Sequence, residues 1–302
     1  MSTVTNFSDL VDQLVNRVER KKVAVVWAAD SHTFEASVMA LKAGFVDITY
    51  VGCQEQLEQR EELREFEQHV RFVPASDPDD AAQKAVALVR SNEAQVLMKG
   101  LINTDNMLRA ILNKETGILI KGNVLTHISV ASIPTYRKLL VFSDAAVIPY
   151  PTQEQREKQV AYVSDLCHSF GIEEPRISLI HCTEKPNEKH FPFTVGYEVI
   201  IDKAKQGEYG KCIVDGPLDL KTSCDLESMK TKGIESPIAG DADAVIFPDI
   251  ESGNIFYKSV TLFAGASTAG ILKGAMAPVV ISSRADSSLS KYYSLTVACM
   301  CK

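Results

Sequence analysis

Short apolar runs alternate with segments of helical periodicity along almost the whole chain. The runs are rich in Val and Ile, as β-strands are, and most precede a stretch whose apolar residues recur at three- and four-residue spacing. The strands that this pattern predicts are 23–27, 48–51, 71–73, 95–98, 139–142, 177–180, 213–214, 245–247 and 279–281. Such alternation favours right-handed crossovers and mainly parallel sheets with helices on both faces, which is an α/β fold.

Cap signals define the predicted helices. Residues 33–43 form one helix with Gly44 as its C-terminal cap, and Pro78 opens another. A further helix is expected at 104–112, and the highly charged segment 55–68 is expected to form a surface helix.

The composition narrows the class of protein. The 302 residues suffice for two domains, and 45% hydrophobic with 24% charged residues is typical of a soluble globular protein. A net charge of −7 argues against nucleic-acid binding, and no stretch approaches the roughly 20 apolar residues of a membrane helix. Seven cysteines include no CxxC pair, no HExxH motif occurs, and the N-terminal segment is unlike a signal peptide. We therefore expect a cytoplasmic protein with reduced thiols and without bound metal, nucleic acid or membrane.

Three strand-to-helix turns collect charged and hydroxyl side chains. They are VLMKGLINTDNMLRA at 96–110, FPDIESGNIFYKS at 247–259 and VVISSRADSSLSKYYS at 279–294. In open parallel sheets, ligands bind beyond the carboxyl ends of strands, where helix N-termini offer unpaired N–H groups. Gly253 in the second turn is expected to let the backbone approach a ligand. Each turn sets a cation beside hydroxyls, so together the turns predict an anionic substrate. The alternative for a single turn is a capped loop with solvated acids.

No nucleotide-binding fingerprint explains these turns. The segment 265–270 has P-loop glycine spacing, but Ile271 and Leu272 follow it, so we expect it to end one helix and let another pack closely. Trp27-Ala28-Ala29-Asp30 stands where GxGxxG would follow the first strand, and no GxSxG elbow occurs.

At these motifs the sequence resembles the phosphate acetyltransferase/phosphate butyryltransferase family over nearly the whole chain. The resemblance rests, in family order, on MKGLINTDNMLRA, LLVFSDAAVIPYPTQEQ, PRISLI, VDGPLDL, AGDADAVIFPDIESGNIFYKS, AGILKGAMAPVV and SSRADSS. VDGPLDL and SRADS are closer to the butyryl branch. The resemblance implies two α/β domains related to isocitrate and isopropylmalate dehydrogenases, residues 1–135 with 278–302 and residues 136–277, with an active-site cleft between them, and a homodimer.

The resemblance also implies the reaction. Acyl-CoA and phosphate give acyl phosphate and free CoA in a reversible reaction, which belongs to butyrate metabolism. Coenzyme A is then a substrate or product, and no tightly bound cofactor is expected. Arg284 and Arg109 match arginines that the family uses for phosphate or CoA, and Ser283 matches the serine that hydrogen-bonds the reacting centre. Lys99 and Thr104 lie on the turn that precedes Arg109 and are expected to add donors. The alternatives are a solvated helix face for Arg109 and a cap with a surface salt bridge for Ser283 and Arg284.

The turn at 247–259 matches a motif typical of the family. Asn254 is expected to bind phosphate or to orient the acyl carbonyl, and Lys258 to bind phosphate or CoA. Asp249 and Glu251 are expected to fix Arg284 or the turn. We interpret Asp144 and Asp215, at strand ends, as structural, and His127 as a core histidine.

The resemblance does not identify the group that exchanges a proton with the CoA thiol. Acetyl-branch relatives have an aspartate seven residues after the serine, where this chain has Ser290. Asp286 is our candidate base, and the alternative is that it caps the final helix. The branch could also need no base, because a thiol pKa lies close to cellular pH.

Three other functions are compatible with the sequence. They are a phosphate acetyltransferase, a non-catalytic acyl-CoA- or phosphate-binding relative, which the serine at position 290 motivates, and a decarboxylating dehydrogenase of the same fold. For the dehydrogenase we identify neither a metal-binding set of aspartates nor a nicotinamide site.

Overall fold

The computed structural model describes residues 4–282 and 286–301 and divides the chain into two compact units. Unit I comprises Phe7–Leu125 with Thr268–Lys302, and unit II comprises Met1–Asn6 with Thr126–Ser267. These boundaries, after residues 125 and 267, lie ten residues before the domain boundaries expected from the sequence.

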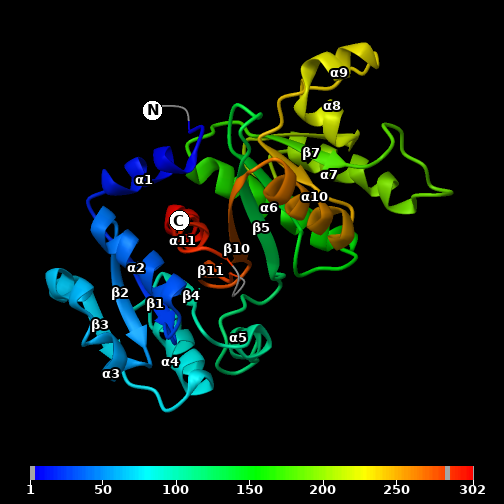
Figure 1. The fold of residues 1–302 in the computed structure, drawn as a ribbon. Helices are drawn as coiled ribbons and strands as arrows, with labels where there is room; N and C mark the ends of the chain where they lie inside the picture. Colours follow the sequence, from blue (N-terminus) through cyan, green and yellow to red (C-terminus); the bar gives the residue numbers. More distant parts are fainter. Residues whose placement is uncertain (1–3, 283–285, 302) are drawn as a thin grey trace. The chain divides into compact units, whose positions relative to one another are not determined.

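Unit I contains a mainly parallel sheet whose strands run in the order β3-β2-β1-β4-β11-β10 (Figure 1). Its strands are β1 (Lys21–Val26), β2 (Val46–Val51), β3 (Val70–Val73), β4 (Val96–Lys99), β10 (Ser267–Lys273) and β11 (Val279–Val280). Strands β3, β2, β1, β4 and β11 are parallel, and β10 is antiparallel to β11.

The helices of unit I pack against this sheet in two groups. They are α1 (Phe7–Val15), α2 (Ser31–Ala43), α3 (Gln54–Leu57), α4 (Pro78–Arg90), α5 (Thr104–Ile111), α11 (Ser288–Met300) and the 3₁₀ helix η1 (Glu61–His69). Helix α11 packs against α1, α2, β11 and β4, whereas α4 packs against α5, β1, β2 and β4. The Asp30 side chain caps the start of α2, Gly44 ends α2 in the left-handed conformation (φ 88°), and Pro78 opens α4 after the Asp77 cap. The predicted end of α2 at Ala43 and the predicted start of α4 at Pro78 are confirmed, whereas α2 begins at Ser31, two residues before the predicted start.

The surface helix predicted at 55–68 is wrong. Helix α3 ends at Leu57, Arg60 is extended (ψ 118°), and a 3₁₀ helix follows. Glutamates at 58, 61, 62 and 65 would repel one another at the three- and four-residue spacing of an α-helix. Only Leu57 and Leu63 are buried in this stretch, which is too little apolar surface to offset that repulsion.

Unit II has its own strand order, β5-β6-β9-β7-β8. Its strands are β5 (Thr126–Ser132), β6 (Leu140–Ser143), β7 (Arg176–Ile180), β8 (Ile213–Leu218) and β9 (Ala244–Ile246). Its helices are α6 (Gln153–Ser169), η2 (Pro192–Val195), α7 (Gly196–Lys205), α8 (Leu220–Cys224), α9 (Leu226–Thr231) and α10 (Ile250–Phe263). Strand β5 is antiparallel to β6 and the others are parallel. The rings of Phe142, Phe247 and Phe256 meet in its core, with two contacts of Phe142 edge-on.

The α/β class and the mainly parallel sheets are confirmed, but two strands were not predicted. Strand β5 contains Thr126, His127 and Ser129, so it lacks a continuous apolar run. The segment 265–270 follows the end of α10 as expected, with Gly265 left-handed (φ 64°), and it continues into strand β10, where Gly270 N–H donates to the Ser294 hydroxyl of α11 (3.0 Å). Small residues dominate β10 and carry little strand signal. Among the described residues, no helix has the length and apolar character needed to cross a membrane.

Candidate functional site

The carboxyl ends of three neighbouring parallel strands lie side by side in unit I. Strand β1 pairs with β4, and β4 pairs with β11, where Leu97 is opposite Val279. The turns that follow these strands therefore share one edge of the sheet, which is where α/β folds bind ligands. Two of the three turns singled out in the sequence, those after β4 and β11, are thus neighbours.

The turns after β1 and β4 are bound to each other by backbone contacts. Gly100 N–H donates to the Val26 carbonyl (2.9 Å), and Leu101 N–H donates to the Trp27 carbonyl (2.8 Å). A Cβ atom on Gly100 would lie 2.5 Å from both carbonyl oxygens. Glycine is required here because the two turns approach so closely.

The predicted binding residues of the β4 turn differ in exposure. The Lys99 side chain is only 3% exposed, and its ammonium lies 3.4 Å from the Gly100 carbonyl oxygen. Asn103 caps α5, so Thr104 is the first helical residue and is exposed. Arg109 is exposed on α5 and donates to the Asn106 side chain (3.3 Å). Lys99 is therefore the buried cation of this turn and Arg109 a surface cation one helical turn away.

The β11 turn holds the other predicted residues. Ser283 and Arg284 lie outside the described residues, and Asp286 follows them in a bend. Ser287 caps α11, because its hydroxyl accepts from Ser290 N–H (3.2 Å). The alternative that Asp286 caps the final helix is therefore wrong. Ser290 donates its own hydroxyl to the Thr268 carbonyl (2.9 Å), so that side chain fastens α11 to β10.

Lys291 is a buried cation beside this turn that the sequence reading missed. Its side chain is 3% exposed and donates to the Ser282 hydroxyl (2.9 Å). Burial lowers the pKa of its ammonium, and the charges of Asp30 and Asp286 partly oppose that shift. The sequence carries one signal for this residue, because Lys291 is the single charged residue of the otherwise uncharged helix α11. Two buried lysines thus lie at this edge of the sheet, Lys99 at the end of β4 and Lys291 on α11 beside Ser282.

Lys291→Met is expected to leave the protein as stable as the parent at pH 7, or more stable. Burial disfavours the charged ammonium, and replacing it by an apolar side chain of similar volume removes that desolvation cost. Because the folded pKa lies below the ordinary 10.5, the unfolded chain binds more protons between the two values, and the parent gains stability as pH rises through that window. The melting-temperature difference between variant and parent should therefore shrink from pH 7 to pH 10.

The exposed Lys22 offers a matched control, since Lys22→Met removes the same charge without relieving burial. A lower melting temperature for Lys291→Met at pH 7, with Lys22→Met unchanged, would show that the contacts of the ammonium outweigh its desolvation.

The third turn, after β9, is in unit II, and its acids serve the local structure. Asp249 caps α10 by accepting from Ser252 N–H (2.8 Å), and the Tyr150 hydroxyl donates to Glu251. A Cβ atom on Gly253 would overlap the Asp144 carbonyl oxygen, well inside the 3.0 Å limit of real contacts. Gly253 thus allows α10 to approach the turn after β6, which replaces our expectation that it approaches a ligand.

The two predicted binding residues of this turn are exposed on α10. Asn254 donates its amide to the Ala145 carbonyl (2.9 Å), which ties the helix to the turn after β6. The Lys258 ammonium lies 4.7 Å from the centre of the Tyr257 ring, within cation–π range. Neither contact uses a charged partner.

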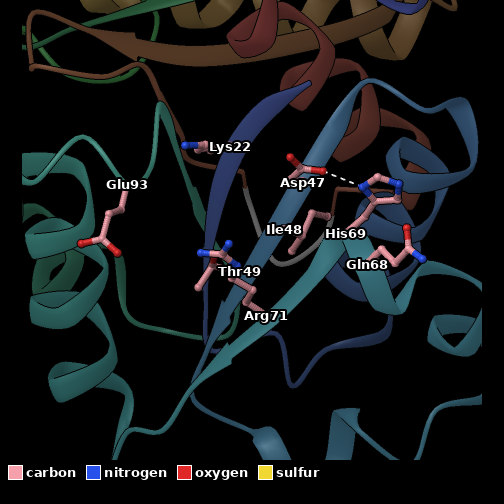
Figure 2. Close-up of a pocket in the computed structure, with 8 residues that line it drawn as sticks. All are labelled: Lys22, Asp47, Ile48, Thr49, Gln68, His69, Arg71 and Glu93. Carbon is pink, nitrogen blue, oxygen red and sulfur yellow. Dashed lines mark hydrogen bonds and ion pairs between the residues drawn. The ribbon is translucent and has the colours of Figure 1, made fainter. Parts of the chain in front are cut away.

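A polar hollow of about 90 Å³ lies at the opposite edge of the unit I sheet (Figure 2). It is lined by Lys22, Asp47, Ile48, Thr49, Gln68, His69, Arg71 and Glu93. His69 and Asp47 pair across it at 2.8 Å. Since Lys22 and Asp47 stand at the amino ends of β1 and β2, this hollow faces away from the strand ends that bind ligands in α/β folds. Within the described residues, no group of three His, Cys, Asp or Glu side chains could hold a metal ion.

Comparison with known proteins gives consistent matches. A family profile described as phosphate acetyl/butaryl transferase matches residues 75–299. A phosphate butyryltransferase from Clostridium acetobutylicum is 34% identical over 302 residues, covering 98% of this chain and 98% of its own. A phosphate acetyltransferase from Thermotoga maritima is 33% identical over 283 residues, covering 93% of this chain and 95% of its own.

Solved structures agree with these relatives. The crystal structure of a branched-chain phosphotransacylase from Enterococcus faecalis V583 matches with a TM-score of 0.81 at 30% identity, covering 93% of this chain and 98% of its own. A putative 4-hydroxythreonine-4-phosphate dehydrogenase from Salmonella typhimurium matches with a TM-score of 0.56 at 14% identity, covering 93% and 99%. The second match shows the fold alone and confirms its likeness to a dehydrogenase. The motifs, the fold and these full-length similarities together show that the chain belongs to the phosphate acetyltransferase/phosphate butyryltransferase family.

Proposed function

We propose that this protein transfers a short acyl group between coenzyme A and inorganic phosphate, with a preference for butyryl-sized chains. The observation that carries the proposal, within this family, is the pair of adjacent turns after β4 and β11, with the buried cations Lys99 and Lys291 beside them. Phosphate is small, doubly charged and strongly hydrated, so a site for it needs fixed cations and N–H donors that replace its water.

The reaction balances without an external reagent. A phosphate oxygen attacks the thioester carbonyl carbon, the carbon–sulfur bond breaks, and the proton of the phosphate ends on the departing CoA thiolate. In the reverse direction, the thiol loses its proton and the thiolate attacks the acyl phosphate. We assign the stabilisation of the reacting centre to Ser283 and Arg284, and the proton transfer to Asp286. Lys99, Thr104 and Arg109 then bind phosphate or CoA from the β4 turn, and Asn254 and Lys258 do so from α10.

The branch assignment rests on VDGPLDL and SRADS, because overall identity to named relatives of the two branches is nearly equal at 34% and 33%. Phosphate-dependent release of free thiol should be fastest with acyl chains of about three to five carbons, and reactions without phosphate are the control. Equal or faster release from acetyl-CoA would make the protein a phosphate acetyltransferase. No release from any acyl-CoA would favour a non-catalytic binding relative. We further propose a cytoplasmic homodimer, which light scattering would test.

A further inference from the structure

A cavity of about 310 Å³ lies in unit II at the amino ends of its central strands. Its walls come from the start of β6, from the residues that precede β9, from the end of α6 and from Val4 near the N-terminus. The volume is at the lower end of the range for small-molecule sites. The turn after β9, which leads into Asn254 of α10, is at the opposite edge of the same sheet.

One part of the cavity is apolar. Its apolar lining residues are Val4, Leu139, Val141, Phe170 and Ile172, of which all but the half-buried Ile172 are buried. Gly171, just after α6, is left-handed (φ 88°), and a Cβ atom there would meet no atom within 4 Å. The end of α6 therefore leaves open space beside these side chains. An apolar ligand group that enters this space is removed from water, which favours its binding.

The other part of the cavity is lined by two cations and two carboxylates. The Lys138 ammonium lies 2.6 Å from the Asp243 carboxylate and 3.0 Å from the Asp241 carboxylate, and it donates to the Asp241 carbonyl (2.9 Å). These contacts use all three donors of the ammonium. Asp243 also accepts from the Arg176 N–H (2.8 Å), so both of its oxygens have a partner. Lys138 and Asp243 are therefore occupied by contacts within the protein.

Arg137 brings the surplus charge to the cavity. Its Nη2 pairs with Asp241, which also lies 3.5 Å from the Arg176 guanidinium. Three cations, counting Lys138, thus surround two carboxylates. The Arg137 side chain is 72% exposed, and its Nε and Nη1 groups have no partner among the described residues. Two N–H donors of a charged group are therefore available at the rim of the cavity.

This combination selects a small carboxylic acid with an apolar chain. The planar guanidinium of an arginine matches a carboxylate, which it binds through two parallel N–H bonds. One surplus positive charge suits a monoanion, whereas a phosphate dianion would bring uncompensated negative charge next to Asp241 and Asp243. The apolar lining suits a hydrocarbon chain attached to that carboxylate.

We propose that this cavity binds a short aliphatic monocarboxylate, with the carboxylate on Nε and Nη1 of Arg137 and the chain against Phe170 and Ile172. The inference goes beyond the proposed acyl transfer and does not depend on it, since no residue assigned to that reaction lines the cavity. Where the acyl transfer also holds, the ligand belongs to the same class as the free acid of the transferred acyl group.

Calorimetric titration of the full-length protein with hexanoate tests the proposal. Hexanoate should bind saturably, and each methylene from propionate to hexanoate should tighten binding about fourfold, because each adds a buried CH₂ group. Hexanol and hexylamine keep the chain but lack the carboxylate, so they should bind about tenfold more weakly or less. Equal affinities for hexanol and hexanoate, an affinity that is independent of chain length, or no saturable binding would each overturn the proposal.

Two variants locate the binding. Arg137→Gln removes the exposed guanidinium and should weaken hexanoate binding about ten- to a hundredfold, the usual effect of losing a hydrogen bond to a charged group. Arg64→Gln is its matched control, because the Arg64 side chain is 71% exposed and pairs with Glu61 in unit I. Ile172→Trp keeps all the charges but fills the cavity from a half-buried position, so hexanoate should no longer bind.

The same variants distinguish this cavity from an acyl pocket at the proposed reaction site. Hexanoate binding that is unchanged in both Arg137→Gln and Ile172→Trp would lie elsewhere, which overturns the proposal whether or not the protein releases thiol from acyl-CoA. Hexanoate binding that both variants weaken, in a protein that releases no thiol, would support the cavity while the acyl transfer fails. Hydrogen exchange gives a second readout, since bound hexanoate should slow exchange at residues 139–141 and 170–172.

Discussion

Asp286→Asn is expected to slow the acyl-phosphate-to-CoA direction by about a hundred- to ten-thousandfold, the usual contribution of a general base. The variant keeps the size of the side chain and removes its basic lone pair. Because Ser287 caps α11, the substitution does not remove a helix cap, and the melting temperature should change little. A large loss of rate with nearly constant stability is therefore the expected signature.

The pH dependence of that loss identifies its cause. The defect should shrink as pH rises toward about 8.5, the ordinary thiol pKa, since the thiolate then forms without a base. Ser290→Ala, at the position of the acetyl-branch aspartate, is the matched comparison. Its hydroxyl donates to the Thr268 carbonyl, so this variant should lower stability slightly and show no pH-dependent defect. Equal rates for Asp286→Asn and the parent at every pH would mean that the protein works without a dedicated base.

The sequence predicted the elements of this fold wherever one local signal dominated. Runs such as Val23 to Val26 and caps such as Gly44 determine a strand and a helix end without reference to the rest of the chain. Strand β10 escaped prediction because small residues form it and its antiparallel pairing with β11 is a tertiary feature. The prediction of an α-helix through the charged segment after Leu57 failed although the local signal was strong. The composition of this segment favours a helix, but charge repulsion along it and its poor burial disfavour one.

The turns that form the candidate site could be predicted from the sequence, but their positions next to one another could not. The β4 and β11 turns are separated by about 180 positions in the sequence, and only the strand register makes them neighbours. Lys291 is recognisable as part of the site only when its burial and its contact with Ser282 are known. The acids of the α10 turn were singled out by residue type alone, and they serve the local structure. Residue type could not reveal this, because capping and ligand binding use the same residue types at helix starts.

Asp144→Asn is expected to destabilise unit II severely. Its carboxylate is 2% exposed and accepts five hydrogen bonds. One oxygen, Oδ1, accepts from the backbone N–H groups of Ala146 (2.7 Å) and Val147 (2.8 Å). The other, Oδ2, accepts from the Thr126 hydroxyl (2.7 Å) and from the N–H groups of His127 (3.0 Å) and Ile148 (3.3 Å).

Whichever oxygen becomes an amide nitrogen in Asp144→Asn, at least two donors lose their acceptor and face another donor. Each unsatisfied buried group costs about 1–3 kcal/mol, so the loss is about 2–6 kcal/mol or more against a total stability of about 5–15 kcal/mol. Urea unfolding should show a markedly lower midpoint, and hydrogen exchange should place the loss in unit II. Asp215→Asn is the control, because Asp215 is half-buried and accepts from the Ser236 hydroxyl, so its midpoint should shift far less. Activity per folded molecule should be retained in Asp144→Asn. A variant that kept the parent's stability and lost its activity would instead place Asp144 among the reacting groups.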